Sequence, residues 1–177
     1  MVTRWIFTAL IILLALQRWY ELRLSGRNET IIRSLGGREY AAWQVQAMKA
    51  LHVGWFIAML VEVYAFRRPF IPGLSLLALI TFAVGQSLRY AALLSLKWRW
   101  TVRVMTIPGL PPVQNGIYRY LRHPNYLGVV LEILAVPLLH SAYVTAIVFS
   151  LTNLLLLSAR IRTEDRALLD AISSPLR

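Results

Sequence analysis

Long apolar stretches that carry almost no charge constrain this chain more than any other feature of its sequence. A helix needs about 20 apolar residues to cross the hydrocarbon layer, where it satisfies its own backbone hydrogen bonds. Hydrophobic residues make up 58% of the chain and charged residues 15%, whereas soluble domains average about 45–50% and about 25%. We therefore predict an all-α, multi-pass membrane bundle of about five transmembrane helices, at residues 5–20, 50–66, 71–96, 126–139 and 142–158.

The last two segments predict a C-terminal helical hairpin that turns near His140 and Ser141. Both arms are shorter than a full crossing, so we expect them to be tilted or to stop short of the far membrane face. Residues 1–177 are interpreted as a single integral-membrane domain. In this interpretation, residues 1–72 hold the N-terminal helices and an amphipathic connection, and residues 73–177 hold the core that carries the chemistry.

The formal net charge of +11 comes from basic residues that lie beside the apolar segments. They gather in the connections that follow the first, third and fifth segments. The positive-inside rule places these connections in the cytoplasm, which predicts an outside N-terminus and a cytoplasmic C-terminus. The bilayer explains the basic residues without nucleic acid, which we do not expect as a partner.

Two connections are too long to be simple turns. Residues 23–49 are expected to be partly helical, and residues 97–122 contain Pro108-Gly109 and Pro111-Pro112, which break helices. Long ordered loops often carry function. We therefore expect the functional site to involve the cytoplasmic connection at residues 97–122.

Four polar residues fall inside the apolar segments, where they are costly and usually face the bundle interior. Arg89 and Glu132 lie at comparable depths, so we expect them to pair. The pair is either a structural ion pair or part of a substrate-binding cavity. Glu62 has no obvious partner in the sequence, and the fourth residue is Gln86.

Several kinds of site are not indicated by the sequence. The chain has no cysteine, and its histidines are not spaced with another ligand as a helical metal pair would be. Phosphate-binding loops, dinucleotide fingerprints and nucleophile elbows do not occur. We therefore expect no metal.

The most informative segment runs from Gly116 to Gly128 and combines three tyrosines, two arginines and a histidine ahead of an apolar helix. Pro124 suits the first turn of that helix, whose free N–H groups could hold an anion. The segment could equally be an aromatic and basic membrane anchor. Near the end of the last helix, Arg160 and Glu164 share one helical face, which a solvated surface pair would also explain.

The pattern G-x-Y-x-x-x-R-H-P-x-Y-x-G, followed by an apolar hairpin and R-x-x-x-E, resembles the isoprenylcysteine carboxyl methyltransferase family. The resemblance covers roughly residues 85–170. Residues 17–22 and 27–29 resemble a bacterial branch that accompanies type III polyketide synthases and methylates alkylpyrones or phenolic lipids. The resemblance implies an S-adenosylmethionine-dependent O-methyltransferase in the bacterial inner membrane, acting on a lipophilic small-molecule or prenylated acceptor.

The resemblance also assigns roles to residues. It implies a cytoplasmic cofactor pocket, in which Arg160 is catalytic and orients the acceptor. If Arg89 and Glu132 line the substrate cavity rather than form a structural ion pair, they contribute to substrate binding. His123 is either a base or, by preference, a structural or cofactor contact. The loop at residues 105–113 departs from the family's polar pattern, and Glu164-Asp165 replaces the usual pair of glutamates. The implied cofactor-binding residues are Val113, Tyr118, His123, Pro124, Asn125, Tyr126 and Glu164.

Two alternatives remain open at this point. One is an NAD(P)H-dependent membrane reductase of related architecture, and the other is a non-catalytic membrane scaffold. Binding of S-adenosylmethionine, of NADPH or of neither would separate the three.

Overall fold

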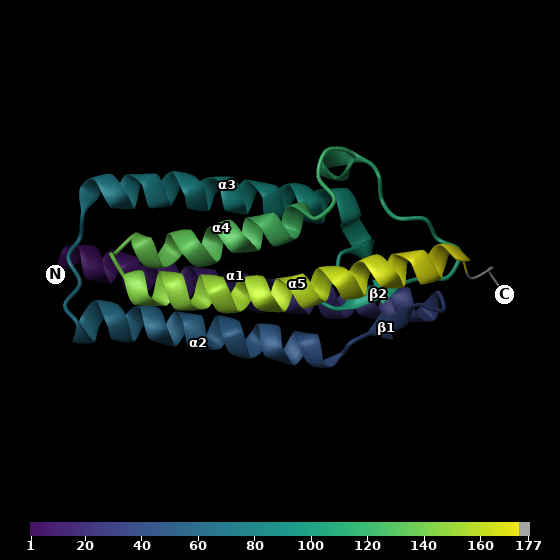
Figure 1. Ribbon diagram of the computed structural model, residues 1–177, viewed down its shortest axis with the longest axis horizontal. Helices are drawn as coiled ribbons and strands as arrows, with labels where there is room; N and C mark the ends of the chain where they lie inside the picture. Colours follow the sequence, from purple (N-terminus) through teal and green to yellow (C-terminus); the bar gives the residue numbers. More distant parts are fainter. Residues whose placement is uncertain (174–177) are drawn as a thin grey trace.

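A computed structural model describes residues 1–173 as one elongated bundle of helices (Figure 1). Short 3-10 helices, at Lys97–Arg99 and Gly116–Arg119, and two three-residue strands join them. The predicted all-α membrane bundle is confirmed. The five α-helices within the described residues are α1 (Val2–Ser34), α2 (Trp43–Ala65), α3 (Pro72–Leu96), α4 (Pro124–Leu138) and α5 (Tyr143–Ser173).

Four of the helices are long and apolar enough to cross a membrane, namely α1, α2, α5 and the stretch from α3 to Arg99. Helix α4 is the exception, because its 15 residues extend only about 22 Å, short of the roughly 30 Å of hydrocarbon. Pro124 fixes its first turn, and Pro137 lies close to its end. The predicted hairpin therefore has one short arm, but its second arm is a long helix.

Helices α1 and α5 continue well beyond the apolar segments that predicted them. The buried face of α1 carries on through Glu21, Ser25, Asn28 and Ile32 at helical spacing, although the apolar run ends near Tyr20. Hydropathy thus located the membrane-embedded part of each helix but not its end. The predicted amphipathic connection at residues 23–49 is largely helix, and only residues 35–42 separate α1 from α2.

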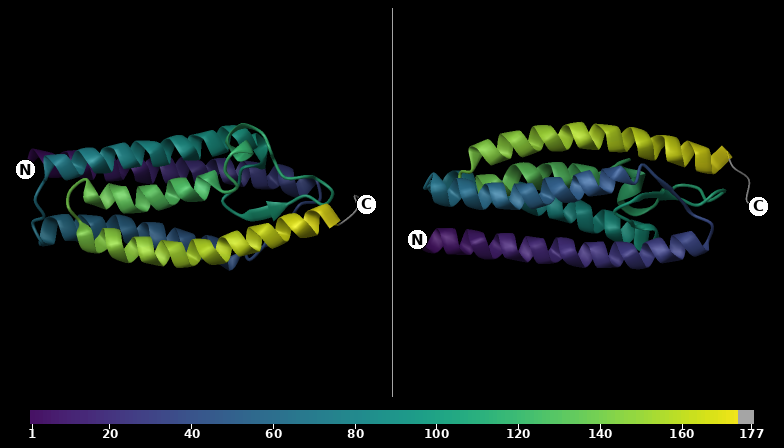
Figure 2. Two further views of the ribbon diagram at one scale, coloured as in Figure 1. Left: turned by 45° about the horizontal axis from the view of Figure 1, so that its top comes forward. Right: turned by 90° about the horizontal axis from the view of Figure 1, so that it is seen from below.

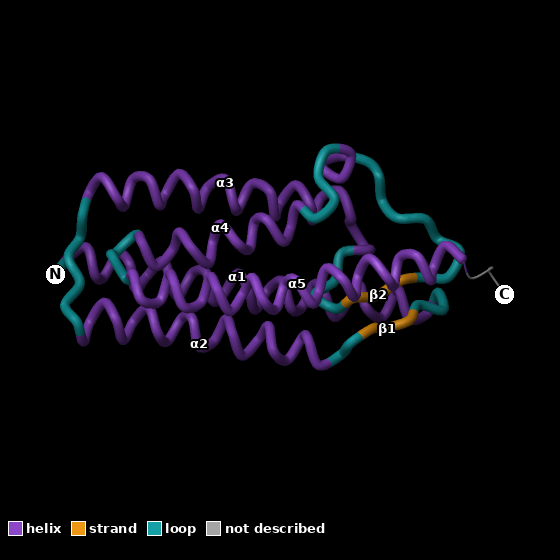
Figure 3. Tube along the Cα trace, viewed as in Figure 1, coloured by secondary structure: helices purple, strands orange, loops and turns teal. Residues whose placement is uncertain are grey.

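A small antiparallel sheet, which the sequence did not predict, closes one end of the bundle (Figure 3). Strand β1 (Arg38–Tyr40) pairs with β2 (Val104–Thr106), with Glu39 opposite Met105. Strands of three residues are too short to show the alternation on which strand prediction depends.

Helix α4 lies between α3 and α5, while α1 and α5 occupy opposite edges of the bundle (Figure 2). The α3–α4 crossing is close because glycines meet there. A Cβ built on Gly128 would lie 2.7 Å from the Gly85 carbonyl oxygen and 2.5 Å from Arg89 Cγ. Small residues allow membrane helices to approach in this way, and the crossing brings Arg89 of α3 beside α4.

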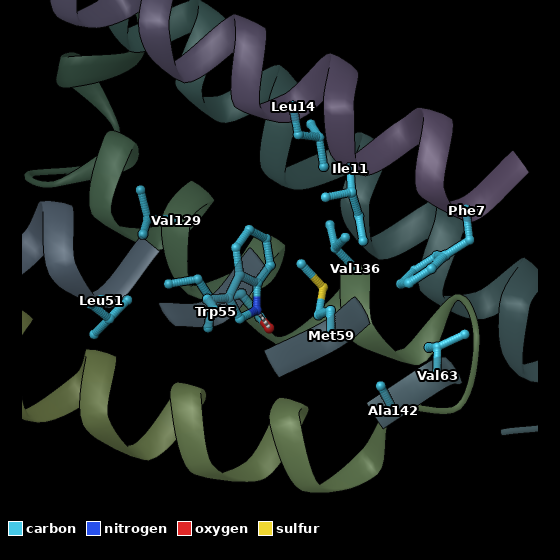
Figure 4. Close-up of a cluster of buried hydrophobic side chains, with 11 residues drawn as sticks. Phe7, Ile11, Leu14, Leu51, Trp55, Met59, Val63, Val129, Val136 and Ala142 are labelled. Atoms are coloured by element: carbon cyan, nitrogen blue, oxygen red, sulfur yellow. Dashed lines mark hydrogen bonds between the residues drawn. The ribbon is translucent and has the colours of Figure 1, made fainter. Parts of the chain in front are cut away.

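The apolar core is centred on Trp55, Met59 and Val136 (Figure 4). Pro137 has no N–H, so the Ile133 carbonyl one turn earlier lacks its helical hydrogen bond. The Trp55 indole supplies the missing donor at 3.3 Å. This contact locks α2 to α4 at a point where a break in the α4 ladder would otherwise leave a polar group unpaired in the membrane.

Glu62 has partners that the sequence did not reveal. Its carboxylate lies 2.7 Å from Arg68 Nη2 and accepts hydrogen bonds from the Val144 and Thr145 backbone N–H groups. These N–H groups belong to the first turn of α5, where unpaired donors favour an anion. Glu62 of α2 therefore caps α5 from a neighbouring helix.

Candidate active site

The three connections rich in basic residues lie at the same end of the bundle, together with the sheet and the loop from β2 to α4 (Figure 1). The N-terminus, the α2–α3 connection and the α4–α5 turn lie at the opposite end. The predicted cofactor-binding and catalytic residues belong to segments at the first of these ends, so segments far apart in sequence can meet there. These residues are Val113, Tyr118, 123–126, Arg160 and Glu164.

Tyr126, near the start of α4, joins the tyrosine-rich turn to the last helix. Its hydroxyl accepts a hydrogen bond from Arg160 Nε at 2.9 Å and donates one to Glu164 Oε2. The Arg160 guanidinium carbon also lies 5.6 Å from the centre of the Tyr126 ring. The structure therefore brings these three predicted site residues into direct contact.

His123 precedes α4 and stacks on Tyr126, with the ring centres 5.5 Å apart and the planes 14° from parallel. Its Nε2 atom lies 3.3 Å from Asp165 Oδ1. The sequence analysis assigned no role to Asp165. Its position next to Glu164 on the last helix is the one signal that could have indicated a role. The imidazole is thus held by a tyrosine on one side and a carboxylate on the other.

Pro124 and Asn125 form the first turn of α4, as predicted. Pro124 is buried, and within residues 1–173 the buried Asn125 Oδ1 atom has no hydrogen-bond partner. Asn125 also helps to line a small recess together with Glu21 and Arg89. An unpaired amide oxygen at this position can accept a hydrogen bond from a bound molecule.

Tyr118 lies in the 3-10 helix Gly116–Arg119, and Val113 is half-buried in the segment leading to it. Burial raises the pKa of the Tyr118 phenol, and the nearby Glu164 charge raises that pKa further, so Tyr118 is a neutral hydrogen-bond donor at physiological pH. Gly116 has φ +57, and a Cβ there would lie 2.2 Å from Ser95 Oγ. Glycine is therefore required where this turn packs on α3.

Arg160 is buried, and a chain of hydrogen bonds connects it to α1 by way of Val102, in the segment that follows α3. Its Nη2 atom donates to the Val102 carbonyl, and the Val102 N–H donates to Ser25 Oγ at 2.9 Å. The Ser25 hydroxyl in turn donates to Glu29 at 2.7 Å. Within the described residues the Arg160 Nη1 atom is buried without a partner, so one face of the guanidinium is free to bind an oxygen.

A cluster around Arg103 fastens the same segment to α1 and β1. Arg103 Nε lies 2.8 Å from Glu29 Oε2, and Arg103 Nη1 pairs with Glu39. Burial opposes ionisation of Glu39, but hydrogen bonds from Arg103 and Arg33 outweigh it and hold the pKa of Glu39 below its ordinary value. The cluster therefore adds to the free energy of unfolding at pH values above the ordinary pKa of a glutamate. This contribution is lost as the pH falls through the lowered pKa of Glu39.

Arg89 and Glu132 pair as predicted, with Arg89 Nη1 2.8 Å from Glu132 Oε2. The sequence did not predict that α1 contributes two further charges. Arg89 Nη2 lies 2.5 Å from Glu21 Oε2, and Arg18 pairs with both Glu21 and Glu132. The cluster is electrically neutral, and among residues 1–173 no hydrogen bond joins it to the Tyr126 group.

A hollow of about 500 Å³ lies outside this site. All of its lining residues belong to α1, including Trp19, Arg23 and Arg27, and the Arg23 guanidinium lies 4.7 Å from the Trp19 ring centre. A hollow lined by a single helix is a gap between surface side chains, and aromatic and basic residues of this kind are common at membrane interfaces. We therefore assign the site from the contacts around Tyr126.

Comparisons with known proteins identify the family of the chain. Residues 77–170 match the model of the isoprenylcysteine carboxyl methyltransferase (ICMT) family. The chain is 37% identical to the uncharacterized protein YpbQ of Bacillus subtilis over 163 residues, which cover 92% of this chain and 96% of that protein. It is 28% identical to an uncharacterized protein of Haemophilus influenzae, over 85% of this chain and 88% of that one.

No solved structure matches this chain. The family match covers α4, α5 up to residue 170 and most of α3. It therefore includes Tyr126, Arg160 and Glu164, which meet in the structure. The chain belongs to the isoprenylcysteine carboxyl methyltransferase family of membrane methyltransferases.

Proposed function

We propose that this protein transfers a methyl group from S-adenosylmethionine to an oxygen atom of a lipophilic acceptor. The observation that carries the proposal is the Tyr126 hydroxyl, which contacts both Arg160 and Glu164. This hydroxyl joins Glu164, which we propose holds the methyl donor, to Arg160, which we propose holds the acceptor, one turn away on the same helix. Methyl transfer needs such a juxtaposition because donor and acceptor must be aligned in line.

The residues present fit S-adenosylmethionine. The Glu164 carboxylate suits the cationic parts of this molecule, and the unpaired Asn125 Oδ1 suits a hydrogen-bond donor. The first-turn N–H groups of α4 suit its carboxylate. When bound, the cofactor supplies a methyl group activated by a sulfonium, so the protein need only bind, align and exclude water. The residues proposed to hold it are Val113, Tyr118, His123, Pro124, Asn125, Tyr126 and Glu164.

Arg160 is proposed as the catalytic residue because its Nη1 atom is buried and unpaired within the described chain. A guanidinium in this state can hold an ionised acceptor oxygen by a charge-assisted hydrogen bond. Tyr126 and the Val102 carbonyl fix the rest of the guanidinium. His123, held by Asp165, is assigned to shaping the cofactor site rather than to removing a proton.

The acceptor is proposed to be either a prenylcysteine-type carboxylate or a long-chain alkylpyrone or phenolic lipid, as in the branch associated with type III polyketide synthases. Its apolar tail would enter between helices from the bilayer, while the water-soluble cofactor would arrive from the cytoplasm. Arg89 and Glu132 are proposed to border this route or to support the helices that form it.

We also propose a bacterial inner-membrane location with the N-terminus outside. The chain contains no cysteine, so single cysteines report topology without background. In intact cells, we expect Phe70→Cys to react with a membrane-impermeant maleimide, and Ser34→Cys to react only after lysis. The reverse labelling pattern would invert the proposed orientation.

Equilibrium binding tests the chemistry directly. Purified protein should bind labelled S-adenosylmethionine, and S-adenosylhomocysteine should compete, while excess NADPH should not. Lipid extract incubated with the protein and deuterated-methyl S-adenosylmethionine should yield a lipid that gains the labelled methyl group. Binding of NADPH alone would favour the reductase, and binding of neither molecule would favour a scaffold.

A further inference from the structure

Asn153, in the middle of α5, carries the largest unexplained polar group inside the membrane. Its side chain is 0% exposed, and neither Nδ2 nor Oδ1 has a hydrogen-bond partner within the described part of the chain. Among residues 1–173 no other residue has two side-chain polar atoms in this state. A buried amide without partners costs roughly 1–3 kcal/mol, and lipid offers no replacement. The group therefore indicates a bound molecule.

The position of Asn153 relates it to the site around Tyr126. Asn153, Leu157 and Arg160 are all buried and lie at helical spacing on the face of α5 that packs against α2 and α4. Seven residues of helix correspond to about 10 Å, so Asn153 lies that far deeper in the bundle than Arg160. Within residues 1–173 both side chains have buried atoms without a hydrogen-bond partner, so this face offers two polar contacts with an apolar stretch between them.

We propose that Asn153 is a specificity-determining residue that recognises a second oxygen-bearing group of the lipid acceptor. The inference rests on the proposed function, in which Arg160 holds the oxygen that receives the methyl group. Because Asn153 lies about 10 Å further along α5 into the membrane, the second group would lie on the membrane side of the oxygen that Arg160 holds.

The amide also sets the chemistry of the second group. Because an asparagine side chain both donates and accepts, it matches a hydroxyl, or an enol and its carbonyl form. Ser150, one turn further from Arg160, has a buried hydroxyl oxygen that also lacks a partner within the described residues, so the polar surface continues along the same part of α5. An acceptor with one polar head on a plain hydrocarbon tail would leave the Asn153 amide unpaired.

Two probes that differ in one hydroxyl test the inference, namely 5-pentadecylresorcinol and 3-pentadecylphenol. We expect the wild-type protein to methylate the resorcinol with a kcat/KM about 10-fold or more above that of the phenol, because a buried group left unpaired penalises the phenol. Asn153→Leu should bring the ratio close to one while keeping activity on the phenol. It should also match or exceed the wild-type melting temperature, because the unpaired amide is gone.

Thr152→Val is the matched control, because Thr152 is exposed on the same turn and its hydroxyl donates to the Val148 carbonyl of its own helix. It should leave the ratio unchanged. Asn153→Ala repeats the measurement with a side chain that cannot overpack the core. If the wild-type protein binds S-adenosylmethionine but methylates neither probe, or if the ratio survives both Asn153 substitutions, this inference fails alone. If the wild-type protein does not bind S-adenosylmethionine, the proposed function fails first.

Discussion

Replacing Glu164 with alanine should raise the dissociation constant for S-adenosylmethionine by about 10- to 100-fold. A hydrogen bond to a charged group contributes about 1.5–3 kcal/mol, and each 1.4 kcal/mol is about tenfold in affinity. Because Glu164 also accepts the Tyr126 hydroxyl, the substitution loosens the turn that carries His123. Isothermal titration in detergent measures the effect, and saturating cofactor should restore most of the turnover.

Arg160→Ala should produce the opposite kinetic pattern. We expect cofactor affinity to stay within about threefold of wild type, while kcat/KM for the acceptor falls about 100-fold through loss of alignment. The matched controls lie on the same helix: Arg162→Ala and Asp170→Ala remove exposed charges and should change neither quantity. Normal binding and turnover in both site variants would reject the proposed roles of Glu164 and Arg160.

Glu132→Gln should destabilise the protein by about 3–5 kcal/mol, the usual effect of removing one partner from a buried ion pair. The substitution leaves Arg18 and Arg89 with Glu21 alone, in a cluster that is neutral in the native protein. Thermal unfolding in detergent should show a large fall in the melting temperature, because the excess positive charge lies among three packed helices.

The double variant Glu132→Gln/Arg18→Gln restores neutrality and should recover most of the lost stability. This rescue separates the two roles left open for Arg89 and Glu132. A structural cluster predicts coupled stabilities and unchanged acceptor selectivity. If Glu132→Gln keeps the wild-type melting temperature but lowers turnover, the carboxylate lines the acceptor route instead.

The apolar segments predicted the helices well because lipid allows few other structures. They did not predict where helices end outside the membrane, since Ser25, Asn28 and Ile32 continue α1 by packing and not by hydropathy. The short strands β1 and β2 escaped prediction because their pairing joins residues 38–40 to residues 104–106. No local pattern encodes a contact over that separation.

The sequence predicted that the tyrosine-rich turn and the end of the last helix share one cofactor, and the direct contact through Tyr126 is what the structure added. Depth along the helices was enough to pair Arg89 with Glu132. Depth alone could not show that Arg18 and Glu21 join this pair. Which face of α1 points toward α3 and α4 depends on how the whole bundle packs. The partners of Glu62 were missed for a related reason: two of them are backbone N–H groups at the start of α5, and sequence composition does not show them.

The anchoring of Arg160 through Val102 and Ser25 bears on how such proteins can be recombined. The family match begins at residue 77, yet Val102, whose carbonyl fixes the guanidinium, is itself held by α1 through its backbone N–H. A chimera that grafts residues 77–170 onto a foreign membrane anchor would keep the tyrosine-rich turn and the last helix. It would lose the contact between Ser25 and Val102 that helps to orient Arg160. A functional chimera therefore needs α1 together with residues 77–170.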